Sequence, residues 1–191
     1  MAGNKIGTPN ALINNAGVNV FHEPLQTDDE EWARCFDINL KGVLFGAQAA
    51  LPHLKKTAPG SCLLNTASAA GLYGTAGASV YSATKFGVRA ITESLDGEWA
   101  EYGINVRSIM PSFIETPLID QLPNGQTNEA IRDRVKAAGL EITPVADVGE
   151  AAWASVNGDK LHTLVGKTAK RVGFASRFLR GQMRKQVRRN A

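Results

Sequence analysis

The feature that most constrains this 191-residue chain is an alternation of short apolar runs with longer helical patterns. Such alternation predicts parallel strands joined by crossover helices, because a helix must return the chain to the end of the sheet where each strand starts. Parallel crossovers are right-handed, so consecutive strands are expected to follow one another across the sheet. The sequence therefore predicts a doubly wound α/β domain with at most four parallel strands, at 11–13, 62–67, 104–110 and 161–165.

Local signals place two long helices between these strands. Thr27 and Glu30 have the spacing of a capping box, which predicts the start of a helix that runs to about residue 56. A second helix is expected from about Ser79 to Tyr102, with Gly103 as its stop signal.

The last third of the chain is expected to begin with a loop. Residues from about 112 to 144 are rich in Pro, Gly, Asn and Thr and predict a long loop with one short helix, of the kind that often binds substrate. A helix at about 145–156 and the fourth strand then complete one domain, residues 1–165. Residues 166–191 are expected to form a basic C-terminal helix of that domain.

Composition indicates an ordinary globular protein, with 43% apolar and 20% charged residues. No apolar run approaches the roughly 20 residues needed to span a bilayer. The first residues show no secretory signal, so a cytoplasmic location is expected by default. Cys35 and Cys62 lie in apolar surroundings, which favours reduced core residues over a disulfide or a metal site.

Tyr81 and Lys85 are the first residues with a potential for catalysis. Spaced i and i+4 on the second long helix, the phenol and the ammonium lie on one face, within reach of each other. A free tyrosine has a pKa of about 10, too high for proton transfer at neutral pH, and a nearby cation lowers that pKa. Taken alone, the pair is better explained by an amphipathic helix with a surface lysine.

Two further segments follow predicted strands, where ligands bind in doubly wound folds. Ser68 lies after the second strand, 13 residues before Tyr81, where its hydroxyl could bond a substrate oxygen. The alternative is a turn or helix-capping serine. Asn14-Asn15-Ala16-Gly17 follows the first strand, and its small residues allow the backbone to approach a ligand. The alternative is a simple tight turn.

The order and spacing of these motifs resemble those of the short-chain dehydrogenase/reductase family, over about residues 8–165. The resemblance implies a Rossmann-like fold, NAD or NADP as cofactor, and an oxidoreductase that interconverts an alcohol and a carbonyl. It is carried by the Asn-Asn-Ala-Gly turn, the serine 13 residues ahead of Tyr-x-x-x-Lys, the segment Asp37-Ile38-Asn39-Leu40-Lys41-Gly42, and the segment Pro111-Ser112-Phe113-Ile114-Glu115-Thr116-Pro117.

The resemblance also implies a role for each matching residue. Tyr81 would be the general acid/base on the substrate oxygen, Lys85 would lower the tyrosine pKa and hold the nicotinamide ribose, and Ser68 would polarise the same oxygen. Asn39 would anchor a water that links Lys85 to solvent; asparagine is otherwise a poor helix-interior residue. Besides Tyr81 and Lys85, the expected cofactor contacts are Asn14, Ala16 and Gly17 on the adenosine side, and Ile114 and Thr116 at the nicotinamide carboxamide.

The chain departs from the family pattern in two places. The family usually has Pro-Gly where this chain has Pro111-Ser112, which adds a side chain beside the nicotinamide. The family also has a Gly-rich turn and a helix that receives the pyrophosphate, and only about a dozen residues precede Asn14 here. We therefore expect a sheet incomplete at its N-terminal half, with 11–13 as an exposed edge strand. The expected cause is a misassigned start, a truncated gene or a fragment.

Charge is divided unevenly along the chain. The net charge is +3, but residues 160–191 carry ten Lys or Arg and no acidic residue, which leaves −7 on residues 1–159. We favour a tail helix packed on the domain or on a subunit neighbour, with solvated arginines; an anionic membrane surface is the alternative. Nucleic-acid binding is not expected, because no recognised module accompanies the charge. The expected apolar face of this helix comprises Val172, Ala175, Phe178, Leu179 and Met183.

Three functions remain compatible with the sequence. The first is an NAD(P)-dependent oxidoreductase for a small-molecule alcohol or carbonyl, forming a homo-oligomer through the two long helices, as the family resemblance implies. The second is a non-catalytic truncated remnant that pairs with full-length relatives through the same helices. The third is a membrane-surface protein directed by its basic tail.

Overall fold

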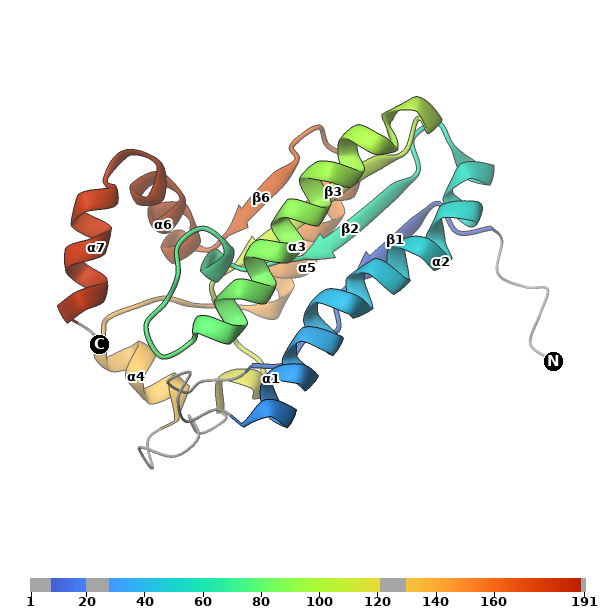
Figure 1. The fold of residues 1–191 in the computed structure, drawn as a ribbon. Helices are drawn as coiled ribbons and strands as arrows, with labels where there is room; N and C mark the ends of the chain where they lie inside the picture. Colours follow the sequence, from blue (N-terminus) through green and yellow to red (C-terminus); the bar gives the residue numbers. More distant parts are fainter. Residues whose placement is uncertain (1–7, 20–27, 121–129, 190–191) are drawn as a thin grey trace.

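Four parallel strands form the central sheet of the computed structural model, which describes residues 8–19, 28–120 and 130–189 (Figure 1). Their order across the sheet follows their order in the chain, which confirms the predicted α/β class and the predicted arrangement of consecutive strands. The strands are β1 (Ala11–Asn14), β2 (Cys62–Thr66), β3 (Asn105–Pro111) and β6 (His162–Val165).

Helices cover both faces of this sheet. The long helices α2 (Gly42–Thr57) and α3 (Ser79–Glu98) lie on one face, and α5 (Val145–Val156) lies on the other (Figure 1). Successive side chains of a strand point to opposite faces. Accordingly Leu63 packs into the core with α2, and its neighbour Leu64 packs beneath α5.

Strand β1 lies at the edge of the described sheet and pairs only with β2. Leu12 packs against the core on the α2 side, whereas the side chain of Ile13 is 50% exposed. The predicted exposed edge strand is therefore confirmed within the described residues.

The first long helix is helical from Asp29 to Thr57, as predicted, but it contains a π-helical turn that was not expected. It consists of α1 (Asp29–Phe36), a π-helical turn η2 (Asp37–Lys41), and α2. In the π turn the N–H of Gly42 donates to the carbonyl of Asp37, one residue further than in an α-helix. Thr27 of the predicted capping box lies outside the described residues. Asp28 is the N-cap, accepting a hydrogen bond from the Glu31 N–H over 2.7 Å.

The second long helix agrees with its prediction to within a few residues. Helix α3 ends at Glu98, and a 3₁₀ turn η4 (Ala100–Tyr102) continues it to the stop signal. Gly103 has a φ of +69°, a left-handed conformation that a glycine adopts at little cost.

The expected loop at 112–144 contains more regular structure than its composition predicts. Strands β4 (Phe113–Ile114) and β5 (Ile142–Thr143) pair in parallel and form a second small sheet. The 3₁₀ turn η5 (Pro117–Asp120) and helix α4 (Ile131–Ala137) lie between them. An apolar cluster holds this unit together, comprising Ile119, Ile131 and Val135 with Phe113 and Ile142.

The basic tail forms two helices, not the single helix that was expected. Helix α6 (Lys167–Phe178) and helix α7 (Arg180–Arg189) are separated at Leu179, whose φ of −128° and ψ of 34° interrupt the helix. The expected single apolar face is consequently wrong, because the break changes the direction in which side chains point. Val172 lines a cavity, whereas Phe178 is 62% exposed.

Two remaining observations concern the described residues as a set. Cys35 and Cys62 are free and fully buried, as the sequence predicted. None of the described helices is long and apolar enough to cross a membrane.

Candidate active site

A cavity of about 570 Å³ opens at the carboxyl ends of β2 and β3. Parallel α/β sheets bind ligands at this edge, because the loops there leave a crevice between helices. The fold brings six of the predicted site residues to this cavity from four separate segments. They are Gly17, Ser68, Tyr81, Lys85, Ile114 and Thr116.

Lys85 places a buried cation beside Tyr81. Its side chain is 4% exposed, and its Nζ donates a hydrogen bond to the Thr66 carbonyl over 3.0 Å. The Nζ lies 5.6 Å from the centroid of the Tyr81 ring. Burial lowers the pKa of Lys85 to about 8, because the charged form loses its hydration. The ammonium is therefore still mostly protonated at neutral pH.

Tyr81 has a raised pKa in this structure. Burial is the largest cause, and a hydrogen bond with Ser68 acts in the opposite direction. The net shift of the Tyr81 pKa is therefore upward, opposite to the lowering that was expected from Lys85, because desolvation of the phenolate dominates. The Tyr81 hydroxyl therefore stays protonated at neutral pH in this structure.

Ser68 caps a turn and lines the cavity at the same time. It directly precedes the 3₁₀ turn η3 (Ala69–Gly71). Its Oγ accepts a hydrogen bond from the Ala70 N–H over 3.2 Å and donates one to the Pro111 carbonyl over 3.4 Å. Ser68 is therefore a capping serine, as the alternative predicted. The same bonds hold its hydroxyl near Tyr81, so the capping role is compatible with a bond to a substrate oxygen.

Asn39 lies fully buried in the π turn, beside Lys85 and Gly17. Its Nδ2 donates to the Val18 carbonyl and its Oδ1 accepts from the Val18 N–H, both over 2.8 Å. A Cβ placed on Gly17 would lie 3.5 Å from the Asn39 Oδ1 and 3.6 Å from the Lys85 Nζ. The asparagine therefore fixes the segment that follows β1 against the buried lysine, and π turns often occur at functional positions.

Asn14 and Ala16 are not among the residues that line the cavity. The amide of Asn14 points into the protein, where its Nδ2 donates to the Val43 carbonyl over 3.2 Å and to the Asn65 Oδ1 over 2.9 Å. Their place on the adenosine side stays a prediction. Asn15, which was not among the expected cofactor contacts, lines the cavity instead.

An apolar wall completes the cavity and was largely missed. Its residues come from the segments that follow β2 and β4 and from the helices α6 and α7, so no single stretch of sequence contains the wall. The i, i+4 spacing of its α7 residues was a signal, but local patterns do not show which way a helix will face. The wall comprises Tyr73, Leu118, Ile119, Val172, Met183 and Val187.

Ser112, where the family usually has glycine, also lines the cavity. Its Oγ is buried and has no hydrogen-bond partner among the described residues. A buried hydroxyl without a partner costs free energy, so a ligand that bonds it would be stabilised there.

The parallel sheet carries Ser68, Tyr81 and Lys85 around one cavity at its carboxyl edge, which is where doubly wound α/β domains bind their ligands. Residues 2–127 match the short chain dehydrogenase family. The chain belongs to this family.

Known proteins similar to this chain support that assignment. The meso-2,3-butanediol dehydrogenase of Serratia marcescens is 38% identical over 130 residues, which are 68% of this chain and 49% of that protein. The cyclopentanol dehydrogenase of Comamonas testosteroni is 38% identical over 112 residues, 59% of this chain and 44% of that protein. The chain thus spans about half the length of the curated relatives it matches.

Solved structures share the fold. A gluconate 5-dehydrogenase from Burkholderia cenocepacia J2315, in complex with NADP and tartrate, superposes with a TM-score of 0.71 at 26% identity, covering 84% of this chain and 64% of that one. The chain therefore shares its Rossmann-like fold class with a solved dehydrogenase structure.

Proposed function

We propose that this chain carries the catalytic part of an NAD(P)-dependent oxidoreductase that interconverts an alcohol and a carbonyl. The observation that carries the proposal is the meeting of Ser68, Tyr81 and Lys85 at one cavity on the carboxyl edge of the sheet. The three residues come from the end of β2 and from α3, and hydrogen bonds or burial fix each of them.

Tyr81 would transfer a proton to or from the substrate oxygen. In the reduction direction its phenol donates the proton as the carbonyl becomes an alcohol, and in oxidation the phenolate accepts it. Ser68 would donate a hydrogen bond to the same oxygen, which polarises a carbonyl. Lys85 would stabilise the phenolate during the reaction by its positive charge.

The described residues fit the nicotinamide side of a dinucleotide. Gly17 leaves the space beside the Lys85 Nζ free of a side chain, and the Ser112 hydroxyl has an unused bonding capacity in the same cavity. Ile114 and Thr116 line the cavity where the carboxamide is expected. The bound nicotinamide would accept or supply the hydride; Lys85 would hold its ribose by a hydrogen bond.

Asn39 would act as a positioning residue. It holds the backbone of Val18, and through it Gly17, against Lys85. The proposed water between Asn39 and Lys85 would give the lysine a path for proton exchange with solvent.

A substrate with an apolar body would suit the cavity. Leu118, Ile119, Val172, Met183 and Val187 provide the wall opposite the polar residues. Such a wall contributes affinity through apolar contact, while the few polar groups orient the reacting oxygen.

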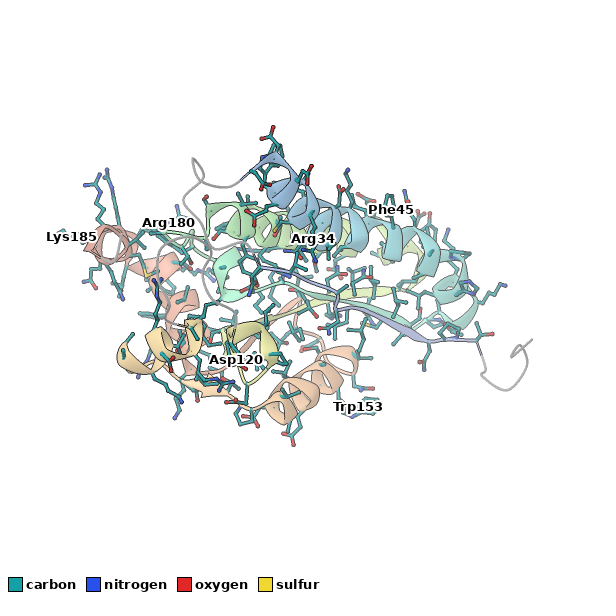
Figure 2. All side chains as sticks on the ribbon, turned by 90° about the horizontal axis from the view of Figure 1, so that it is seen from below. Arg34, Phe45, Asp120, Trp153, Arg180 and Lys185 are labelled. Atoms are coloured by element: carbon teal, nitrogen blue, oxygen red, sulfur yellow. The ribbon has the colours of Figure 1, made fainter. Side chains whose placement is uncertain are left out.

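A homo-oligomer through the two long helices is also proposed. The outer surfaces of α2 and α3 present Leu44, Phe45 and Phe86, which are 40%, 63% and 39% exposed. Figure 2 shows Phe45 on the outer side of α2, away from the sheet. Burying these side chains against a second copy would remove apolar surface from water.

Binding of NADH and NADPH to the purified chain, followed by nucleotide fluorescence, tests the proposal. We expect saturable micromolar binding, weakened by Lys85→Ala and unchanged by Lys55→Ala, which alters a lysine on α2 outside the cavity. With a panel of small ketones, Tyr81→Phe should lower turnover by about 10²- to 10⁴-fold. No binding at millimolar nucleotide by a folded chain would instead favour the non-catalytic remnant.

A further inference from the structure

Helix α6 presents two aromatic side chains to solvent. Phe174 and Phe178 are 59% and 62% exposed, and their ring centroids lie 5.0 Å apart. They are spaced i and i+4, so they share one face of the helix. We call this surface the α6 outer face, defined by the two phenylalanines and the three exposed basic residues around them, Lys170, Arg171 and Arg177.

The basic residues surround the aromatic pair because of helical spacing. Lys170, Arg171 and Arg177 lie three or four positions from Phe174, which places them on the same side of α6. The Arg177 guanidinium lies 5.4 Å from the centroid of the Phe178 ring. The result is an apolar centre with a cationic border.

The opposite side of α6 holds the helix on the domain, so the outer face is not needed for packing. Ala169 is fully buried, and Thr168 and Val172 line the cavity. Gly173 packs against Leu164 of β6, which a Cβ would approach to 2.5 Å. The orientation of α6 is therefore fixed by the core, and its aromatic side is left outside.

Charge decides which partner fits this surface. Residues 160–191 carry ten basic side chains and no acidic one, so the partner should be anionic. A second copy packed face to face would bring the same cations together, which is unfavourable. Single-stranded nucleic acid is bound by charged grooves with stacking platforms, whereas this face is the convex outside of a helix. Figure 2 shows Arg180 and Lys185 at the same end of the molecule.

We propose that the α6 outer face docks on a membrane surface that contains anionic phospholipids. The Phe174 and Phe178 rings enter the interfacial layer, and the surrounding cations pair with lipid phosphates, as amphipathic helices do when they lie in the plane of a membrane. The proposal is independent of catalysis, because it uses neither the cofactor nor the substrate.

Co-sedimentation of the full chain with vesicles tests this. Vesicles of phosphatidylcholine mixed with phosphatidylglycerol should bind the chain, and vesicles of phosphatidylcholine alone should not. Replacing Lys170, Arg171 and Arg177 with Gln should weaken binding about 100-fold, since each basic residue near an anionic surface contributes roughly a factor of five. Phe174→Ser with Phe178→Ser should weaken it at least about tenfold, by removing the inserted apolar area.

Matched variants elsewhere provide the controls. Trp153→Ser removes a side chain that is 73% exposed on α5, and the triple change of Arg34, Lys56 and Lys136 to Gln removes the same charge from other exposed positions. Both should leave vesicle binding unchanged. Circular dichroism verifies folding, which surface changes should preserve.

Three outcomes would overturn the proposal. They are no binding to anionic vesicles, equal loss in the control variants, and retained binding after the changes to the α6 outer face. Sedimentation velocity and oligonucleotide titration complete the test. A dimer abolished by the phenylalanine changes, or oligonucleotide binding without vesicle binding, would assign the face to another partner.

Discussion

Lys85 of α3 donates a hydrogen bond from its Nζ to the carbonyl of Thr66, the last residue of β2, over 3.0 Å. The bond ties the helix to the carboxyl end of a central strand and holds an ammonium where solvent hardly reaches it. A cation in this position lowers the free energy of unfolding, because burial removes its hydration.

Replacing Lys85 with Met should stabilise the fold. The pKa of Lys85 falls from 10.5 to about 8 on folding, so below about pH 8 the folded chain bears the full cost of the buried charge. We expect the unfolding free energy at pH 7 to rise by about 1–3 kcal/mol, after the loss of the Thr66 bond is included.

The pH dependence gives a second signature of the same group. Between about pH 8 and 10.5 the unfolded chain binds the Lys85 proton more strongly than the folded chain, so stability rises with pH in this window. Lys85→Met should remove this rise, and Lys56→Met on the surface should keep it. Urea unfolding across the pH range measures both, and a destabilised Lys85→Met would contradict the expectation.

Asn39→Ala should destabilise the segment that follows β1. The change removes two 2.8 Å hydrogen bonds to Val18 from a fully buried position. We expect a loss of about 1–3 kcal/mol, because the partly buried backbone groups of Val18 lose their partner. Asn157→Ala, which removes an exposed amide bonded to the Trp153 carbonyl, is the matched control and should cost much less. Equal losses in the two variants would show that Asn39 has no special positioning role.

Gly46→Ala should be destabilising although it lies in a helix. A Cβ there would come within 2.0 Å of the Asn14 Oδ1, and two hydrogen bonds hold that amide in place. We expect a cost of about 1–3 kcal/mol from the forced displacement. Gly149→Ala on α5 meets no atom within 4 Å and should stabilise the fold by about 0.5–1 kcal/mol. Thermal unfolding of both variants distinguishes packing from helix propensity.

Met183→Lys should impair use of apolar substrates, if the proposed function is correct. Met183 lines the cavity from α7, so the change places a charge in its apolar wall. We expect KM for an apolar ketone to rise about tenfold with a smaller effect on kcat, since the wall contributes apolar binding. Gln186→Lys adds the same charge on an exposed position of α7 and serves as the control. Similar kinetics for the two variants would exclude α7 from the substrate site.

Local sequence patterns predicted much of the fold. The strand segments, the end of α3 at Gly103 and the position of α5 all follow from apolar periodicity and from turn residues, which act over a few residues. Predictions failed where contacts between segments far apart in the chain determine the structure. The small sheet of β4 and β5 forms because Phe113 and Ile142 share an apolar cluster, although the intervening residues have the composition of a loop.

The candidate site shows the same division. The i, i+4 spacing of Tyr81 and Lys85 was sufficient to predict that they share one helix face, because helix geometry is fixed locally. The position of Ser68 beside them was expected from the family resemblance, because Ser68 lies on another element. The inward orientation of Asn14 was not predictable, since it depends on Val43 and Asn65, which lie 29 and 51 residues away.

The sequence by itself determined the parallel α/β order, because the periodicity of strands and helices acts over a few residues. The order of its motifs supplied the expected polar site residues through the family resemblance. Only the tertiary structure decided how deeply Lys85 is buried and which backbone Asn39 holds. It also decided that α6 and α7 line the cavity, and that α6 exposes Phe174 and Phe178 to solvent. These properties arise from packing between segments far apart in the chain, and packing sets desolvation, orientation and exposure.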